Sequence, residues 1–408
     1  MKRAVFWLAF GIILILASAL CLTATEILAR LVMLSAAPAD KIFQEYSRVS
    51  YTTREFHVAA SINRYGFRGE ETRISNGQIA VLGDSFVFGW GVNNDQTWPK
   101  KLQNHLASTD RPLKVYNLGK PGADPDDYLR IARSYIPFLK PKIVLVSLLQ
   151  GEDPGQLMAK AILHRPFFED AVETKSTFVE TQFRGLLAAA RSMSTSASSA
   201  TENWSSVAKE ITKNLTLPSD IREWFESGNL NPGYLSVVAK FPRGMLDPYE
   251  DPYAAFVEER LLGILGEIKE LVENNGGVLV LISMPFGGYF PSQIRGSFSR
   301  MGFELPPLDF TKMDELVKNL AGRLGIQCIV MSDELRLRKD LSNIWYQFDG
   351  HLTEYGNEVV AEHIFEALSL TRAEISSIDA KNRQQTNGRE LDFGSAKCGE
   401  HSLWPAGR

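Results

Sequence analysis

Short apolar runs alternate with amphipathic segments along most of the chain. Five runs rich in Val, Ile and Leu lack polar alternation, as strands buried on both faces do. They predict strands at residues 78–82, 114–118, 142–149, 277–284 and 326–331. Helical periodicity lies between or after them, at residues 98–107, 125–139, 253–273, 313–324 and 354–370. This alternation predicts an α/β fold, with a parallel sheet of about five strands covered by helices on both faces.

Residues 155–252 interrupt this alternation. About a hundred residues without a clear strand exceed an ordinary connection between elements. Helical patterns occur at residues 177–191 and 204–215, around a segment rich in Ser, Thr and Ala. We interpret residues 155–252 as a helical insertion, either a cap or a lobe for a protein partner, within a domain that spans residues 77–374. Residues 375–408 are polar without core periodicity, which predicts a disordered tail.

The N-terminus carries the strongest apolar run. Residues 4–25 are uncharged, and at 1.5 Å per residue they are long enough to cross a hydrocarbon core of about 30 Å. We therefore expect a membrane anchor at residues 1–30, followed by a lead-in at residues 31–76. A cleavable signal peptide is the alternative, because residues 17–19 resemble a cleavage site. Lys2 and Arg3 precede the run, which predicts that the rest of the chain lies outside the cytoplasm.

The amino-acid composition argues against several classes of function. Apolar residues make up 44% and charged residues 23% of the chain, as in ordinary globular proteins. A net charge of -4 argues against a nucleic-acid partner, which basic surfaces bind. Three cysteines cannot form a disulfide scaffold, and neither they nor the six histidines follow a metal-ligand spacing. We expect no metal and no cofactor.

Two glycine-containing blocks follow the first two predicted strands. Ser85 stands in Gly83-Asp84-Ser85, where ligands gather beyond the carboxyl ends of parallel strands. Gly122 ends the block at residues 117–122, where glycine lets a backbone N–H approach a ligand. Taken singly, Ser85 could cap a turn and residues 117–122 could form an ordinary strand-to-helix turn.

A third block, Asp349-Gly350-His351, precedes the last predicted helix. Residues two apart in an extended segment project to one side, so Asp349 and His351 can point into one cleft. A neutral imidazole can take a proton from a serine hydroxyl while a carboxylate holds its other nitrogen. The alternative is that both are surface loop residues.

Together these blocks resemble the SGNH (GDSL-type) serine hydrolase superfamily. The lead-in at residues 62–69 is similar to that of its membrane-anchored members, and the Asp-x-His spacing is similar to that of the alginate O-acetyltransferase branch. The resemblance implies a flavodoxin-like three-layer α/β/α fold. It also implies Ser85 as nucleophile, His351 as general base, Asp349 as its orienting acid, and the N–H groups of Ser85 and Gly122 as oxyanion donors.

One position departs from the family pattern. Where the resemblance places an asparagine whose amide donates to the oxyanion, this chain has Glu152, and an ionised carboxylate cannot donate. Either burial keeps Glu152 protonated, or Gln150 supplies its amide from the same side of an extended backbone. We favour Gln150, because it needs no shifted pKa.

Two hypotheses of function follow. The first is an extracytoplasmic, membrane-anchored esterase or O-acyltransferase that acts on acyl esters, with polysaccharides or other envelope compounds as substrates implied by the resemblance. The second is a binding or assembly protein that retains the fold without catalysis, which the substitution at Glu152 favours.

Overall fold

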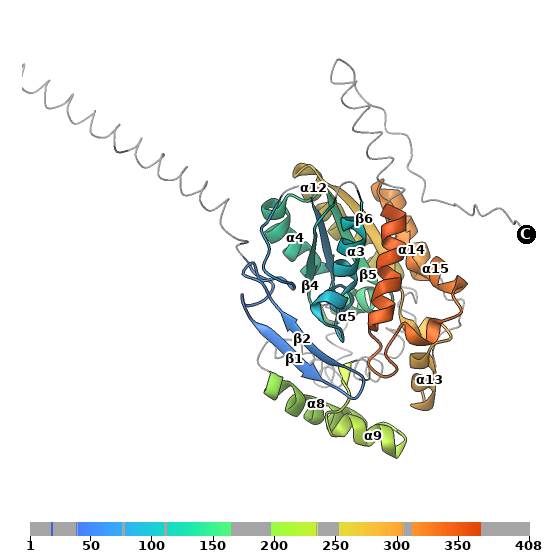
Figure 1. Ribbon diagram of the computed structural model, residues 1–408. Coiled ribbons are helices and arrows are strands. Elements are labelled where there is room, and N and C mark those ends of the chain that lie inside the picture. The colour runs from blue at the N-terminus through green and yellow to red at the C-terminus, as the bar shows by residue number, and fades with distance from the viewer. Residues whose placement is uncertain are drawn as a thin grey trace, which may run out of the picture. The chain divides into compact units, whose positions relative to one another are not determined.

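The computed structural model describes residues 18, 38, 40–75, 78–109, 112–164, 197–233, 235, 253–303, 305 and 312–368 (Figure 1). The chain divides into two units, Met1–Asp40 and Lys41–Arg408, and every element below belongs to the second. The predicted tail and nearly all of the predicted anchor lie outside the described residues. Within the described ranges, no helix has the length and apolar character needed to span a membrane.

The centre of the second unit is a five-stranded sheet whose neighbouring strands are all parallel. Its strands are β3 (Ile79–Gly83), β4 (Val115–Gly119), β5 (Ile143–Leu149), β6 (Val278–Met284) and β7 (Gln327–Val330). The order β4-β3-β5-β6-β7 is that of flavodoxin-like folds. Each strand lies within one residue of its predicted bounds, so the predicted sheet is confirmed.

Alternate residues of the sheet face two separate apolar cores. Ile79 and Val81 of β3 pack with α3 (Trp98–Ala107) and the final helix, residues 354–368. Ala80 and Leu82 face the other way. They pack with α4 (Pro125–Leu139), α12 (Tyr253–Asn274) and α14 (Lys312–Leu324). Because side chains alternate along a strand, this pattern produces the predicted three layers, with helices on both faces (Figure 1).

Residues 31–76, predicted only as a lead-in, contain a hairpin. Strands β1 (Arg48–Thr52) and β2 (His57–Ser61) pair antiparallel. Their inward side chains Tyr51, Phe56 and Val58 form a small core with Trp90, beside the central sheet. The alternation of buried and exposed positions along β2 is a strand signal that the prediction for the lead-in missed.

The described part of the insertion is helical, as predicted. It contains α5 (Glu152–His164), α8 (Ala197–Thr212) and α9 (Ser219–Glu226), while residues 177–191 lie outside the described residues. Helix α5 begins three residues before the predicted boundary. Short helices complete the chain: α2 (Ser85–Phe88), η1 (Asn94–Gln96), η3 (Gly287–Tyr289), α13 (Gln293–Arg300), α15 (Met331–Leu337) and η4 (Leu341–Asn343).

Candidate active site

Ser85 begins α2 directly after β3. The strand order reverses beside β3, and such switch points are where open α/β sheets place their ligands. The Asp84 carboxylate caps α2 by accepting from the Phe86 N–H at 2.9 Å. A Cβ on Gly83 would lie 2.3 Å from Val87 Cγ2, so this turn needs glycine. The local sequence therefore places the Ser85 hydroxyl at the carboxyl end of the sheet.

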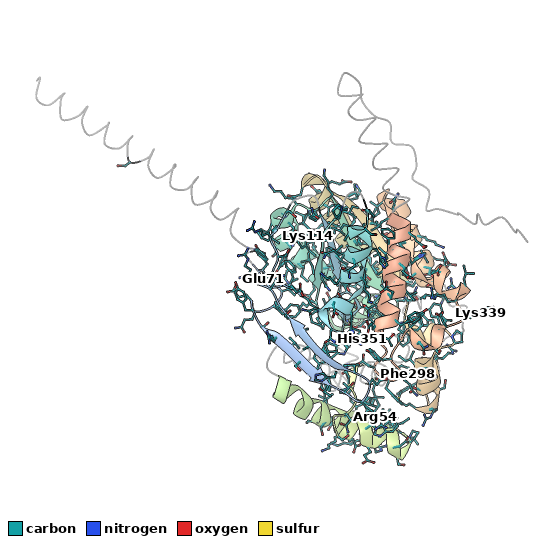
Figure 2. The ribbon with its side chains drawn as sticks, viewed as in Figure 1. Arg54, Glu71, Lys114, Phe298, Lys339 and His351 are labelled. Carbon is teal, nitrogen blue, oxygen red and sulfur yellow. The ribbon has the colours of Figure 1, made fainter. Side chains whose placement is uncertain are left out.

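His351 and Asp349 meet Ser85 from the other end of the chain. His351 Nε2 lies 2.7 Å from Ser85 Oγ, and His351 Nδ1 lies 2.5 Å from Asp349 Oδ1. All three side chains are buried. In Figure 2, His351 lies toward one end of the sheet and Lys114, which precedes β4, toward the other. The structure thus joins the three residues predicted as a triad into one hydrogen-bonded chain.

The charges around His351 favour its action as a general base. Burial by itself lowers the pKa of His351, but the charge and the hydrogen bond of Asp349 outweigh burial and raise that pKa above 6.5. The Asp349 carboxylate therefore stabilises an imidazolium, as proton transfer from a serine hydroxyl requires.

Three further residues hold Asp349, and none of them is predicted from the sequence. Trp90 Nε1 and Asn231 Nδ2 donate to Asp349 Oδ2 at 3.2 and 2.8 Å. The carboxylate of Glu55, in the β1–β2 turn, accepts the N–H of Phe348 at 2.9 Å and that of Asp349 at 2.7 Å. Burial first, and the charge of Asp349 second, raise the pKa of Glu55 to about 7. The lead-in and the insertion thus both contribute to the site.

Gln150 does not fill the role that we assigned to it. Its Nε2 lies 3.1 Å from Ser283 Oγ, 2.7 Å from Asp314 Oδ1 and 3.0 Å from Ser332 Oγ. An amide nitrogen has two hydrogens, and these buried acceptors take both. Our preference for Gln150 over Glu152 was therefore wrong, because β6, α14 and α15 use its donors within the core.

Glu152 has the electrostatic environment of a protonated acid. Burial first, and the negative charge of Asp84 second, raise its pKa to about 8, against the opposing effect of His351. Burial likewise raises the pKa of Asp84 to about 6. Asp84 Oδ2 is buried and, within the described ranges, accepts no hydrogen bond. At neutral pH Glu152 therefore holds a proton, and a protonated carboxyl can donate.

Gly122 lies in the turn after β4, with φ 69°, in the left-handed region that glycine adopts readily. The Lys120 N–H donates to the Gly83 carbonyl at 3.1 Å, which fixes this turn against the end of β3, just before Ser85. Asn117 anchors it further by donating to the Val87 carbonyl at 2.8 Å and accepting from Gly119 N–H at 3.0 Å. Among the described residues, the Gly122 N–H donates to no backbone carbonyl.

Arg68, from the lead-in, holds the segment that follows Ser85. Its buried guanidinium donates to the carbonyls of Phe88 at 2.8 Å, Gly89 at 2.6 Å and Val92 at 2.5 Å. Arg68 Nε also donates to Asn94 Oδ1 at 3.0 Å. Burial lowers the pKa of Arg68 to about 10, still far above neutral pH. A charged donor thus satisfies three buried carbonyls beside the nucleophile.

One group of metal-ligand residues occurs in the part of the chain that the structure describes. It consists of His105 on α3 and Glu358 and Glu362 on the final helix, with ligand atoms within 4.8 Å of one another. Glu358 already pairs with Lys101 Nζ at 2.6 Å and His105 Nε2 at 2.8 Å. We interpret the group as an ion-pair cluster.

Comparison with known proteins gives likenesses among solved structures. No family model matches the chain, and no curated protein matches it. The chain is similar to a crystal structure of TesA at 13% identity, with a TM-score of 0.37 over 72% of this chain and 98% of that one. It is similar to a GDSL-like lipase from Bacteroides thetaiotaomicron at 12% identity, with a TM-score of 0.32 over 72% and 88%. It is also similar to a catalytic mutant of an acetylxylan esterase from Geobacillus stearothermophilus at 8% identity. The TM-score is 0.34, and the match covers 72% of this chain and 95% of that one.

Proposed function

We propose that this protein is a serine esterase or O-acyltransferase that works through an acyl-enzyme on Ser85. The observation that carries the proposal is the continuous contact from Ser85 Oγ to His351 Nε2, at 2.7 Å, and from His351 Nδ1 to Asp349 Oδ1, at 2.5 Å. Hydroxyl, imidazole and carboxylate in this order are the groups that nucleophilic acyl transfer requires.

In the first half-reaction Ser85 Oγ attacks the ester carbonyl while His351 Nε2 takes the hydroxyl proton. The tetrahedral intermediate then collapses, His351 returns this proton to the departing alcohol oxygen, and the acyl group stays on Ser85. In the second half-reaction water or a sugar hydroxyl attacks the acyl-enzyme and loses its proton to His351. His351 then returns a proton to Ser85 Oγ as the bond between this oxygen and the acyl group breaks. Asp349 remains ionised throughout and stabilises the imidazolium.

We assign the oxyanion donors to the N–H of Ser85, the N–H of Gly122 and the protonated carboxyl of Glu152. Two backbone donors and one side-chain donor match the usual composition of such a site. Glu152 replaces Gln150 in this role, because its raised pKa gives it the proton that donation needs. On this assignment the substitution at residue 152 is compatible with catalysis at neutral pH.

We place the domain outside the cytoplasm, anchored by residues 1–30, with envelope or glycan acyl esters as substrates. The apolar run at residues 4–25 and the basic residues before it support this orientation.

Labelling of the full chain with a fluorophosphonate, followed by peptide mapping, tests the nucleophile. We expect one labelled peptide that contains Ser85, and no label in Ser85→Ala or His351→Ala. Ser147→Ala is the matched control, because Ser147 is a buried serine on β5 outside the triad, and it should label normally. Labelling elsewhere, or none in the folded wild type, would refute the proposal and favour a binding protein that has lost catalysis.

A further inference from the structure

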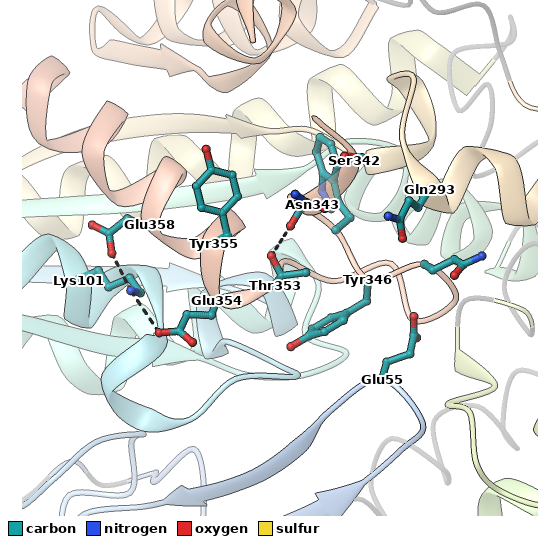
Figure 3. A pocket seen from close by; sticks show the side chains of 12 residues that line it. Glu55, Lys101, Gln293, Ser342, Asn343, Tyr346, Thr353, Glu354, Tyr355 and Glu358 are labelled. Carbon is teal, nitrogen blue, oxygen red and sulfur yellow. Dashed lines mark hydrogen bonds and ion pairs between the residues drawn. The ribbon is translucent and has the colours of Figure 1, made fainter. Parts of the chain in front are cut away.

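A cavity of about 770 Å³ lies beside the segment that carries the triad acid and base. Glu55 and Tyr346 line one end, and Lys101 and Glu358 line the other (Figure 3). Its wall follows residues 345–347 and 353–355, on both sides of Asp349 and His351 in the sequence.

Two residues that line the cavity, Tyr346 and Glu55, form hydrogen bonds with the segment that carries Asp349 and His351. The Tyr346 N–H donates to the His351 carbonyl at 2.8 Å, and the Tyr346 hydroxyl donates to the Gly91 carbonyl at 2.8 Å. At the same end, Glu55 accepts the Asp349 N–H at 2.7 Å. A molecule bound in this cavity would therefore lie against the loop that positions the triad.

Two tyrosine rings in the wall are held in place by their hydroxyls. Tyr346 is fixed by Gly91, and the Tyr355 hydroxyl accepts from Arg338 Nη2 at 2.6 Å and donates to Asp340. Tyr355 is 39% exposed, which is unusual for a large aromatic side chain in this structure. Fixed, accessible aromatic rings are pre-organised surfaces on which the apolar face of a sugar ring can stack.

Polar groups with unused hydrogen-bonding capacity lie between these rings. The side chains of Gln293, Ser342, Asn343 and Gln347 line the cavity. In the part of the chain that the structure describes, none of the four makes a side-chain hydrogen bond. The nearby Thr353 hydroxyl donates to the Asn343 carbonyl at 2.5 Å and accepts the Gly356 N–H at 3.1 Å. Amides and hydroxyls both donate and accept, which is what a polyhydroxylated ligand requires.

The charges of the cavity exclude an anionic ligand. Lys101 is its one cation among the described lining residues, and its Nζ lies 2.6 Å from Glu358 and 3.9 Å from Glu354. Glu55 adds a third carboxyl group. A uronate carboxylate would meet this acidic surface without a free cation to pair with, and unpaired like charges weaken binding.

From these observations we infer that the cavity is a saccharide subsite for a pyranose unit that carries no carboxylate. The identity of that saccharide as the acylated substrate or acceptor rests on the proposed function. The acidic lining selects a neutral or amino-sugar polymer over a uronic-acid polymer such as alginate.

Isothermal titration of the full-length Ser85→Ala protein tests the subsite without turnover. The probes are xylotetraose and tetra-N-acetylchitotetraose, both neutral, and tetramannuronate, which carries four carboxylates. We expect at least one neutral probe to bind with a millimolar or lower dissociation constant, and tetramannuronate to bind at least tenfold more weakly. Equal or tighter binding of tetramannuronate, or no saturable binding of either neutral probe, would overturn the inference.

Variants locate the binding to the cavity. Asn343→Ala should raise the dissociation constant of the neutral probe about fivefold through loss of one hydrogen bond. Tyr355→Leu should raise it about tenfold through loss of the aromatic face. Asn214→Ala removes an exposed amide outside the cavity and should change nothing. Equal affinity in all three variants would place the sugar elsewhere. Since fluorophosphonate labelling tests Ser85 independently, the failure of either proposal is distinguishable from the failure of the other.

Discussion

Because residue 152 is a glutamate, the dependence of the acylation rate on alkaline pH tests its proposed role as an oxyanion donor. In the proposed mechanism Glu152 donates to the oxyanion only while it is protonated, and burial raises its pKa to about 8. At pH 9, one unit higher, about a tenth of the carboxyl keeps its proton, so the acylation rate should fall about tenfold between pH 7 and pH 9. His351 must be neutral to accept the Ser85 proton, and its raised pKa sets the acid side of the profile above pH 6.5.

The variants Glu152→Gln and Glu152→Ala separate donation from other roles. A glutamine amide donates at every pH, so Glu152→Gln should keep kcat/KM within about tenfold of wild type at pH 7. It should also lose the alkaline fall. Glu152→Ala removes the donor and should reduce kcat about a hundred- to a thousandfold. The assay is p-nitrophenyl acetate hydrolysis from pH 5.5 to 9.5.

The same proton affects stability. Because the folded-state pKa of Glu152 is raised from 4.5 to about 8, the folded chain holds a proton that the unfolded chain releases between these pH values. The free energy of unfolding should therefore decrease as pH rises through this window, by about 1.4 kcal/mol per unit and at most about 5 kcal/mol in total. Urea unfolding of Glu152→Gln should show a shallower decrease than the wild type, since Glu55 and Asp84, whose pKa values are also raised, still titrate in the variant. An alkaline fall that persists in Glu152→Gln, or equal rates for the Gln and Ala variants, would refute the assignment.

Four other variants, at three residues, test the surroundings of the site. Asn231→Ala should cost about tenfold in kcat/KM. Asn231→Asp sets a second carboxylate against Asp349 and should shift the acid limb of the profile to higher pH; an unmoved limb would contradict a positioning role. Arg68→Met leaves three buried carbonyls without a hydrogen-bond donor. It should lower the free energy of unfolding, measured by urea denaturation, by about 3 kcal/mol or more. Gln150→Ala should lower it by about 2 kcal/mol and yet slow acylation less than Glu152→Ala, and the opposite ranking would restore Gln150 as the donor.

The strands and the helices between them could be predicted because their signals are local. The run at residues 143–149 is apolar throughout because both faces of β5 are buried, and its helix neighbours show 3.6-residue periodicity. The positions of Ser85, Asp349 and His351 followed from motifs that end strands or precede a helix. The hairpin β1–β2 was missed although its alternation is visible, because two five-residue strands are a weak signal beside a long apolar anchor.

The different surroundings of Gln150 and Glu152 could not be predicted from the local sequence. An extended backbone would place Gln150 and Glu152 on one side, but the chain leaves β5 at Leu149 and enters α5 at Glu152. The two side chains therefore diverge, and Gln150 turns to Asp314 while Glu152 experiences the charges of Asp84 and His351. The spacing of residues in the sequence does not predict that these two side chains diverge.

By itself, the sequence determined the parallel sheet, its two helical layers and the residues of the triad, because periodicity and turn chemistry act over a few neighbouring positions. Only the tertiary structure decided which groups surround Asp349. Trp90, Glu55 and Asn231 come from the turn after α2, from a hairpin and from the insertion, and they meet because those segments pack against one loop. Burial at that meeting point also sets which acids keep their protons, since desolvation depends on every segment that covers a group.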